Sequence, residues 1–125
     1  MRYTLLLHYP EMTPEELGPE MQAEGERLFE AYAAALEQAG VLLAAEVLAQ
    51  SSATTTVMRR DERLLVQDGP HAATKEQLAG TFLIDVVDAD EAIRWAGDAP
   101  LIDHGWIEVR PGMVHFTGGA WVPNA

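Results

Sequence analysis

The chain has 125 residues, of which 20 are acidic and 8 basic, so its formal net charge is −12. This charge repels phosphate groups, which argues against binding to nucleic acid or to anionic membranes. The chain has no cysteine, which excludes disulfides, thiol nucleophiles and thiolate metal sites. Its length suits one globular domain, and it has no apolar run of about 18 residues. The apolar run at residues 5–7 is too short for a signal peptide, so we do not expect one. We therefore expect a soluble cytoplasmic protein.

The first part of the chain predicts a strand, a helix and a second strand. Residues 3–9 place apolar side chains at alternate positions, as a strand with one covered face does. A Thr-Pro-Glu-Glu capping box at 13–16 is interrupted by a Gly-Pro pair at 18–19, which predicts one short turn before a long helix over 19–39. Residues 41–48 predict the next strand.

The rest of the chain predicts an inserted hairpin, a strand, a short helix opened by an acidic capping box, a last strand, and an extension that can form one more strand. The hairpin corresponds to 54–59 with 63–66, and the strand after it to 81–87. The short helix corresponds to 88–96, the last strand to 106–110 and the strand of the extension to 114–117. Without the hairpin, the order is strand, helix, strand, strand, helix, strand. This order predicts an α+β fold of the ferredoxin-like type, with a four-stranded antiparallel sheet and both helices on one face.

The face of this sheet without helices should be partly apolar, because Leu6, Leu83 and Trp106 fall on it. A bare apolar sheet face implies a partner. We therefore expect a homodimer with the sheets packed face to face, and the extension after residue 111 can contribute to the interface.

Several polar residues are predicted to lie at one end of this sheet, where the first strand ends and the third core strand and last strand begin. Imidazoles near carboxylates can transfer protons near neutral pH, and Lys75 can neutralise an enolate or a carboxylate substrate. We expect catalytic roles for His8, Asp68 and His71, and ligand-binding roles for Thr74, Lys75, Asp103 and His104.

The same residues also have structural interpretations. Asp68 and the Gly-Pro pair after it are typical of a turn, and Thr74 could open a capping box for a short helical turn over 75–78. His71 could pack as a flat ring, and His104 could be a solvated turn residue. His8, His71, Asp103 and His104 lack the spacing of a metal site, so neither a metal nor another cofactor is expected.

The string Asp68-Gly69-Pro70, followed by Thr74-Lys75-Glu76-Gln77-Leu78 and Gly80, resembles the YCII-related family in the branch named for a DGPF motif. The resemblance implies a dimeric α/β barrel, with a YCII-related domain over 1–111 and an extension over 112–125. His71 stands where this motif usually has phenylalanine. The helix over 21–38 has no histidine, so the histidine–aspartate pair proposed for shorter relatives does not carry over intact.

Three classes of function follow from the sequence and the resemblance. The first is a lyase-like or isomerase-like enzyme that uses acid–base chemistry in a small-molecule pocket at the end of the sheet. The second is a dimer that binds a ligand in the same pocket without catalysis. The third is a regulatory partner of a transcription factor, because the resemblance implies association with alternative sigma factors.

Overall fold

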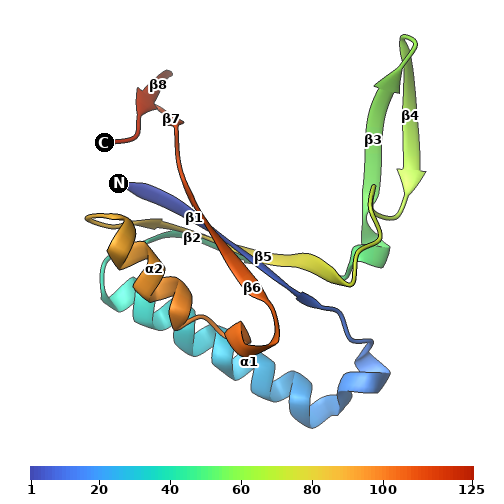
Figure 1. Ribbon diagram of the computed structural model, residues 1–125, viewed down its shortest axis with the longest axis horizontal. Helices are drawn as coiled ribbons and strands as arrows, with labels where there is room; N and C mark the ends of the chain where they lie inside the picture. The colour runs from blue at the N-terminus through green and yellow to red at the C-terminus, as the bar shows by residue number, and fades with distance from the viewer.

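The computed structural model describes all 125 residues and is built on a four-stranded antiparallel sheet in the order β2-β5-β1-β6, with both helices on one face (Figure 1). This order is that of the ferredoxin-like fold, so the predicted fold class is confirmed. The core elements are β1 (Arg2–Pro10), α1 (Pro14–Gln38), β2 (Leu42–Val47), β5 (Glu76–Asp85), α2 (Ala89–Gly97) and β6 (Trp106–Pro111). Neither helix combines the length and the apolar character that a membrane span needs.

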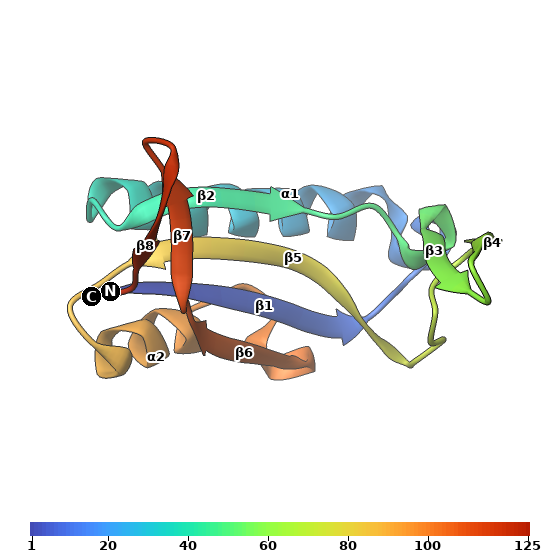
Figure 2. The same ribbon diagram turned by 90° about the horizontal axis from the view of Figure 1, so that it is seen from above.

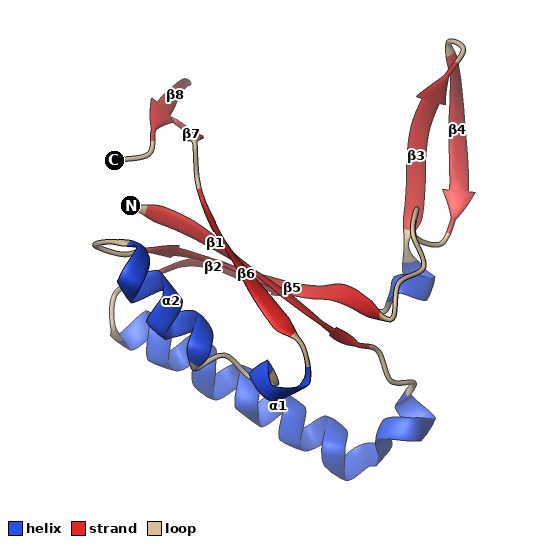
Figure 3. Cartoon of the chain, viewed as in Figure 1, coloured by secondary structure: helices blue, strands red, loops and turns tan.

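Two hairpins stand apart from this sheet. They are formed by β3 (Thr55–Arg60) with β4 (Arg63–Asp68), and by β7 (Val114–Thr117) with β8 (Ala120–Pro123). Both rise on the side of the sheet that the helices leave uncovered, one at each end (Figure 3). Two short 3-10 turns complete the chain, η1 (Ser51–Ala53) and η2 (Ile102–His104).

The hydrophobic core lies between the sheet and the helices. On β1, the alternation buries Tyr3, Leu5 and Leu7 on the helix side, where they meet residues of β5 that are also buried. Tyr32 of α1 stands edge-on to Phe82 of β5, with ring centroids 5.0 Å apart. The other buried core residues are Leu36, Ile84, Val86, Ala92, Ala96 and Ala99.

Both helices begin at the predicted capping residues. Thr13 Oγ1 accepts a hydrogen bond from Glu16 N at 3.1 Å, and Asp88 Oδ1 accepts one from Glu91 N at 2.9 Å. Gly18 leaves the helical conformation, with φ 76° and ψ 160°, so α1 has a short first turn, a kink and then its long part. The short turn before a long helix is therefore confirmed.

The predicted helical turn over 75–78 is wrong. Residues from Glu76 onward belong to β5, and Glu76 and Gln77 lie opposite the last residues of β1. Pairing with β1 gives these residues backbone partners that a helical turn would have had to replace. Thr74 Oγ1 donates to Glu76 O at 2.6 Å, so Thr74 closes the loop before β5 and does not cap a helix.

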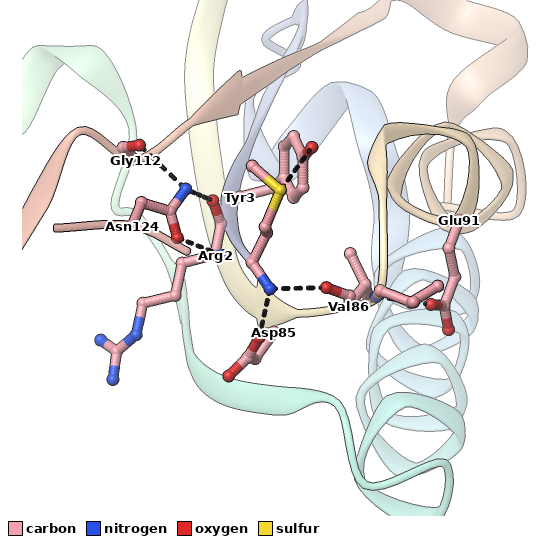
Figure 4. A network of polar contacts seen from close by, with 9 residues as sticks. Arg2, Tyr3, Asp85, Val86, Glu91, Gly112 and Asn124 are labelled. Carbon is pink, nitrogen blue, oxygen red and sulfur yellow. Dashed lines mark hydrogen bonds and ion pairs between the residues drawn. The ribbon is translucent and has the colours of Figure 1, made fainter.

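The two ends of the chain meet at the end of the sheet where β1 starts and β5 ends (Figure 4). The amino group of Met1 donates to Asp85 Oδ1 at 2.9 Å and to Val86 O at 2.7 Å. Asn124 Oδ1 accepts from Arg2 N, and Asn124 Nδ2 donates to the carbonyls of Arg2 and Gly112. These contacts tie the base of the β7–β8 hairpin to β1.

Candidate functional site

A cavity of about 560 Å³ lies between the N-terminal part of α1, up to Phe29, and the end of the sheet at which β1 ends. It exists because α2 is short. α2 has 9 residues and is about 14 Å long, whereas the part of α1 after its kink, residues 19–38, is about 30 Å long. Figure 2 shows α1 running along the sheet while α2 covers only the end near the termini. The other end of the helical layer has one helix where the covered end has two.

The walls of this cavity are mainly apolar. Met21, Leu28 and Phe29 of α1 line one side, and Leu48 and Ala79 line part of the sheet side. Met21 is 55% exposed and Leu28 is 41% exposed, whereas Tyr32 and Leu36 of the same helix are buried. The cavity therefore presents the part of the apolar stripe of α1 that α2 does not reach.

Gly25 enlarges this cavity from the middle of α1. No atom lies within 4 Å of the position that a Cβ at Gly25 would take. Gly25 lines the cavity and does not have a positive φ, so its backbone conformation does not require glycine. The missing side chain leaves space in the cavity wall.

Polar side chains also line the cavity beside its apolar walls, namely Tyr9, Glu11, Gln22, Glu24, Glu26, Gln50 and His104. Tyr9 and His104 line it, from the end of β1 and from η2. Burial raises the pKa of Tyr9 above its usual value, so its phenol stays neutral and can donate or accept a hydrogen bond. Glu11 also lines the cavity, and its two carboxylate oxygens accept hydrogen bonds from Ser51 N and Ser51 Oγ, both at 2.6 Å.

His8, the first predicted catalytic residue, lies on the open face of the sheet. Its ring stacks on Trp106, with centroids 5.6 Å apart, and its Nε2 lies 2.8 Å from Glu108 Oε1. That nitrogen is buried and makes no well-aligned hydrogen bond, so the contact with Glu108 is a close approach of an imidazole and a carboxylate. The sequence did not indicate Glu108 as the partner of His8, although both residues occupy the open face by strand alternation.

The other predicted site residues are spread over three segments. Asp68 ends β4, His71 and Lys75 lie exposed in the loop before β5, and Asp103 and His104 belong to η2. Of all the predicted residues, only His104 lines the cavity. The catalytic and ligand-binding roles given to the others stay predictions.

The Asp-Gly-Pro segment closes the base of the β3–β4 hairpin. Gly69 has φ 90°, the positive value expected of glycine in a turn. Its N–H donates to Thr54 O at 2.7 Å, and its carbonyl accepts from Thr56 Oγ1 at 2.8 Å. The turn interpretation of this segment is confirmed for Gly69. No three His, Asp or Glu side chains lie close enough together to hold a metal ion.

Comparison with known proteins decides the family. Residues 1–114 match the YCII-related domain, which is most of the chain. The chain belongs to the YCII-related family. An uncharacterised protein of Rhizobium meliloti (strain 1021) is 37% identical over 83 residues, which are 65% of this chain and 67% of that protein.

Sequence reasoning missed the cavity of this YCII-related protein because it followed polar residues. The available signal was a difference in length: the apolar stripe of α1 runs from Met21 to Leu36, and a helix of 9 residues cannot cover it. Gly25, in the middle of a helix without a turn to form, was a second signal.

Proposed function

We propose that this YCII-related protein is a homodimer in which each copy binds a small apolar molecule in the cavity under the first half of α1. The observation that carries the proposal is the pre-formed cavity of about 560 Å³, with Gly25 in its wall. Its size and its apolar lining with a few polar groups are typical of small-molecule sites. Glycine inside a helix lowers its stability by about 0.5–1 kcal/mol relative to alanine. Ligand binding in the space beside Gly25 gives a reason for this loss of stability.

Binding is better supported than catalysis. The ionisable groups at the cavity are Tyr9, His104 and the carboxylates of Glu11, Glu24 and Glu26. The raised pKa of Tyr9 keeps its proton in place near neutral pH, and Glu11 and Glu24 are already held by Ser51 and Arg27. The predicted acid–base residues His8, Asp68 and His71 do not line the cavity. A lyase or isomerase reaction that uses those three residues would therefore need a second copy to bring them to the cavity.

The binding proposal can be tested with Nile red, an uncharged dye that fluoresces more strongly in apolar sites. We expect the protein to bind the dye, and Gly25→Phe to weaken binding about tenfold or more because the new ring occupies the cavity. Ala34→Phe is the matched control, since Ala34 lies exposed on α1 and does not line the cavity. Equal binding by both variants, or no binding by the unchanged protein, would overturn the proposal.

The open face and the two hairpins support the homodimer. A two-stranded hairpin is marginally stable alone, yet β3–β4 leaves Val57, Leu64 and Val66 more than half exposed. Both hairpins rise beside the same open face, on which Trp106 is 48% exposed (Figure 1). A second copy lying between the hairpins would cover the face and the apolar residues together.

Sedimentation analysis tests the dimer. We expect the unchanged protein to sediment at twice the 13.7 kDa of one chain, and Leu83→Glu to sediment as a monomer because it places a charge on the open face. Val87→Glu adds the same charge after the end of β5, outside the sheet, and should leave the dimer intact. A monomeric unchanged protein would contradict the proposal and would favour a regulatory role, in which a transcription factor such as a sigma factor covers the open face.

A further inference from the structure

The charged residues around the cavity all have the same sign. The lining includes Glu11, Glu24 and Glu26, and it includes neither lysine nor arginine. Lys75, which is predicted from the sequence to neutralise an anionic substrate, is not part of the lining. A ligand in this cavity therefore meets carboxylates and no fixed cation of the same chain.

Two of these carboxylates keep an uncompensated negative charge. Glu24 forms an ion pair with Arg27 one turn further along α1, which largely cancels its charge. Glu11 is held by the N–H and the hydroxyl of Ser51, which are neutral donors and leave the carboxylate charged. Glu26 makes neither an ion pair nor a side-chain hydrogen bond within the chain, so it is free to contact a ligand.

The N-terminus of α1 does not reverse this sign. A helix N-terminus carries a partial positive charge, and Leu17 near the start of α1 lines the cavity. The first turn, however, contains Glu15 and Glu16, which offset the positive end of the dipole. The potential at the cavity is therefore negative in a chain whose net charge is already −12.

We propose that the occupant of the cavity is a small apolar molecule that carries an ammonium group, and not a carboxylate or a phosphate. The inference rests on the proposed function and adds the chemical class of the ligand. The apolar part of the molecule lies against Met21, Leu28 and Phe29, and the ammonium group lies beside Glu26. Tyr9 and His104 offer further hydrogen bonds at the sheet side of the cavity.

The proposal is tested with three probes that share one apolar body: 2-(2-naphthyl)ethylamine, 2-(2-naphthyl)ethanol and 2-naphthylacetate. Each is titrated against the protein with bound Nile red at low salt, and the concentration that displaces half of the dye is measured. We expect the amine to bind most tightly and the carboxylate least, with about a tenfold difference between them. Added salt screens charge, so it should narrow the difference in affinity between the amine and the carboxylate. The affinity of the uncharged alcohol should not change.

Two variants locate the source of the preference. Glu26→Gln removes the free carboxylate at the cavity, and we expect it to weaken the amine about threefold or more while the alcohol binds as before. Glu30→Gln makes the same change in net charge one turn further along α1, outside the cavity lining, and should leave the amine unaffected. An equal loss in both variants would mean that only the overall charge matters and would overturn the proposal.

The outcomes separate this inference from the proposed function. If none of the probes displaces the dye and the dye itself does not bind, the cavity is not a ligand site. If the alcohol binds and the carboxylate binds as well as or better than the amine, the cavity is a site but the ammonium proposal is wrong.

Discussion

The two halves of α1 present the same kind of apolar stripe to very different surroundings. Towards its C-terminal end, Tyr32 and Leu36 are buried in the core, whereas towards its N-terminal end Met21 and Leu28 are 55% and 41% exposed at the cavity. The difference arises because the neighbouring helix α2 is too short to cover the N-terminal part of α1. An amphipathic pattern therefore predicts which side of a helix faces inward, and the length of the neighbouring element decides whether that side becomes core or cavity.

The largest expected effect is a difference in how much a leucine-to-alanine substitution destabilises the protein at the two ends of α1. Leu36 is fully buried, so Leu36→Ala removes core contacts and should lower the free energy of unfolding by about 3 kcal/mol. Leu28 is 41% exposed at the cavity, and Leu28→Ala should lower it by less than about 1 kcal/mol. Urea denaturation of the two variants measures both values. Similar losses would show that the first half of α1 is packed as tightly as the second.

The next prediction concerns pH dependence in the packed half. Tyr32 donates a hydrogen bond to Trp95 O at 2.7 Å, and burial, with a smaller contribution from the Asp98 carboxylate, raises the pKa of its phenol above the ordinary value of 10.0. Above pH 10.0 the unfolded chain releases the phenol proton of Tyr32 while the folded chain keeps it, so the free energy of unfolding falls as pH rises. This stability is complete below the unfolded pKa.

Replacing this phenol should remove the alkaline loss. We expect the unchanged protein to lose about 1.4 kcal/mol per pH unit above pH 10 through Tyr32, and Tyr32→Phe to lose correspondingly less. At neutral pH the variant should be less stable by about 1 kcal/mol or less, because Trp95 O loses the Tyr32 hydroxyl but keeps the N–H of Asp98 as a donor. Urea denaturation at several pH values between neutral and alkaline gives both numbers. The same alkaline slope in both proteins would assign the loss to other groups.

Local signals in the sequence were enough to predict most of the fold. Thr13 and Asp88 cap helices through side chains close in sequence, and the alternation along β1 needs only the residues of that strand. The prediction failed at Thr74, where a local capping pattern competed with pairing to the distant β1 and the strand pairing won. Local pattern therefore sufficed where the partner was near in sequence.

The candidate site was predicted less well for the same reason. The polar residues around Asp68 led to a predicted site at the loop after β4. The cavity depends instead on how far α2 extends over the sheet and on which residues of α1 it leaves uncovered. His104 was the one predicted residue that the structure places on the cavity, and Tyr9 was considered only as part of a strand. An empty volume between distant elements has no local signature, so only the mismatch in helix lengths could have indicated it.

The smallest expected effect falls on Gly25 and joins stability to binding. Gly25→Ala adds a methyl group that meets no atom within 4 Å, so the helix should gain about 0.5–1 kcal/mol in free energy of unfolding, while Nile red binding weakens slightly as the cavity loses volume. Ala34→Gly on the exposed side of α1 should lose a similar amount of stability without changing dye binding. A Gly25→Ala variant that gains stability and binds the dye unchanged would mean that the glycine is not needed for the cavity. A gain in stability together with weaker binding would show that the first half of α1 gives up helix stability to keep the cavity open, which the packed second half has no reason to do.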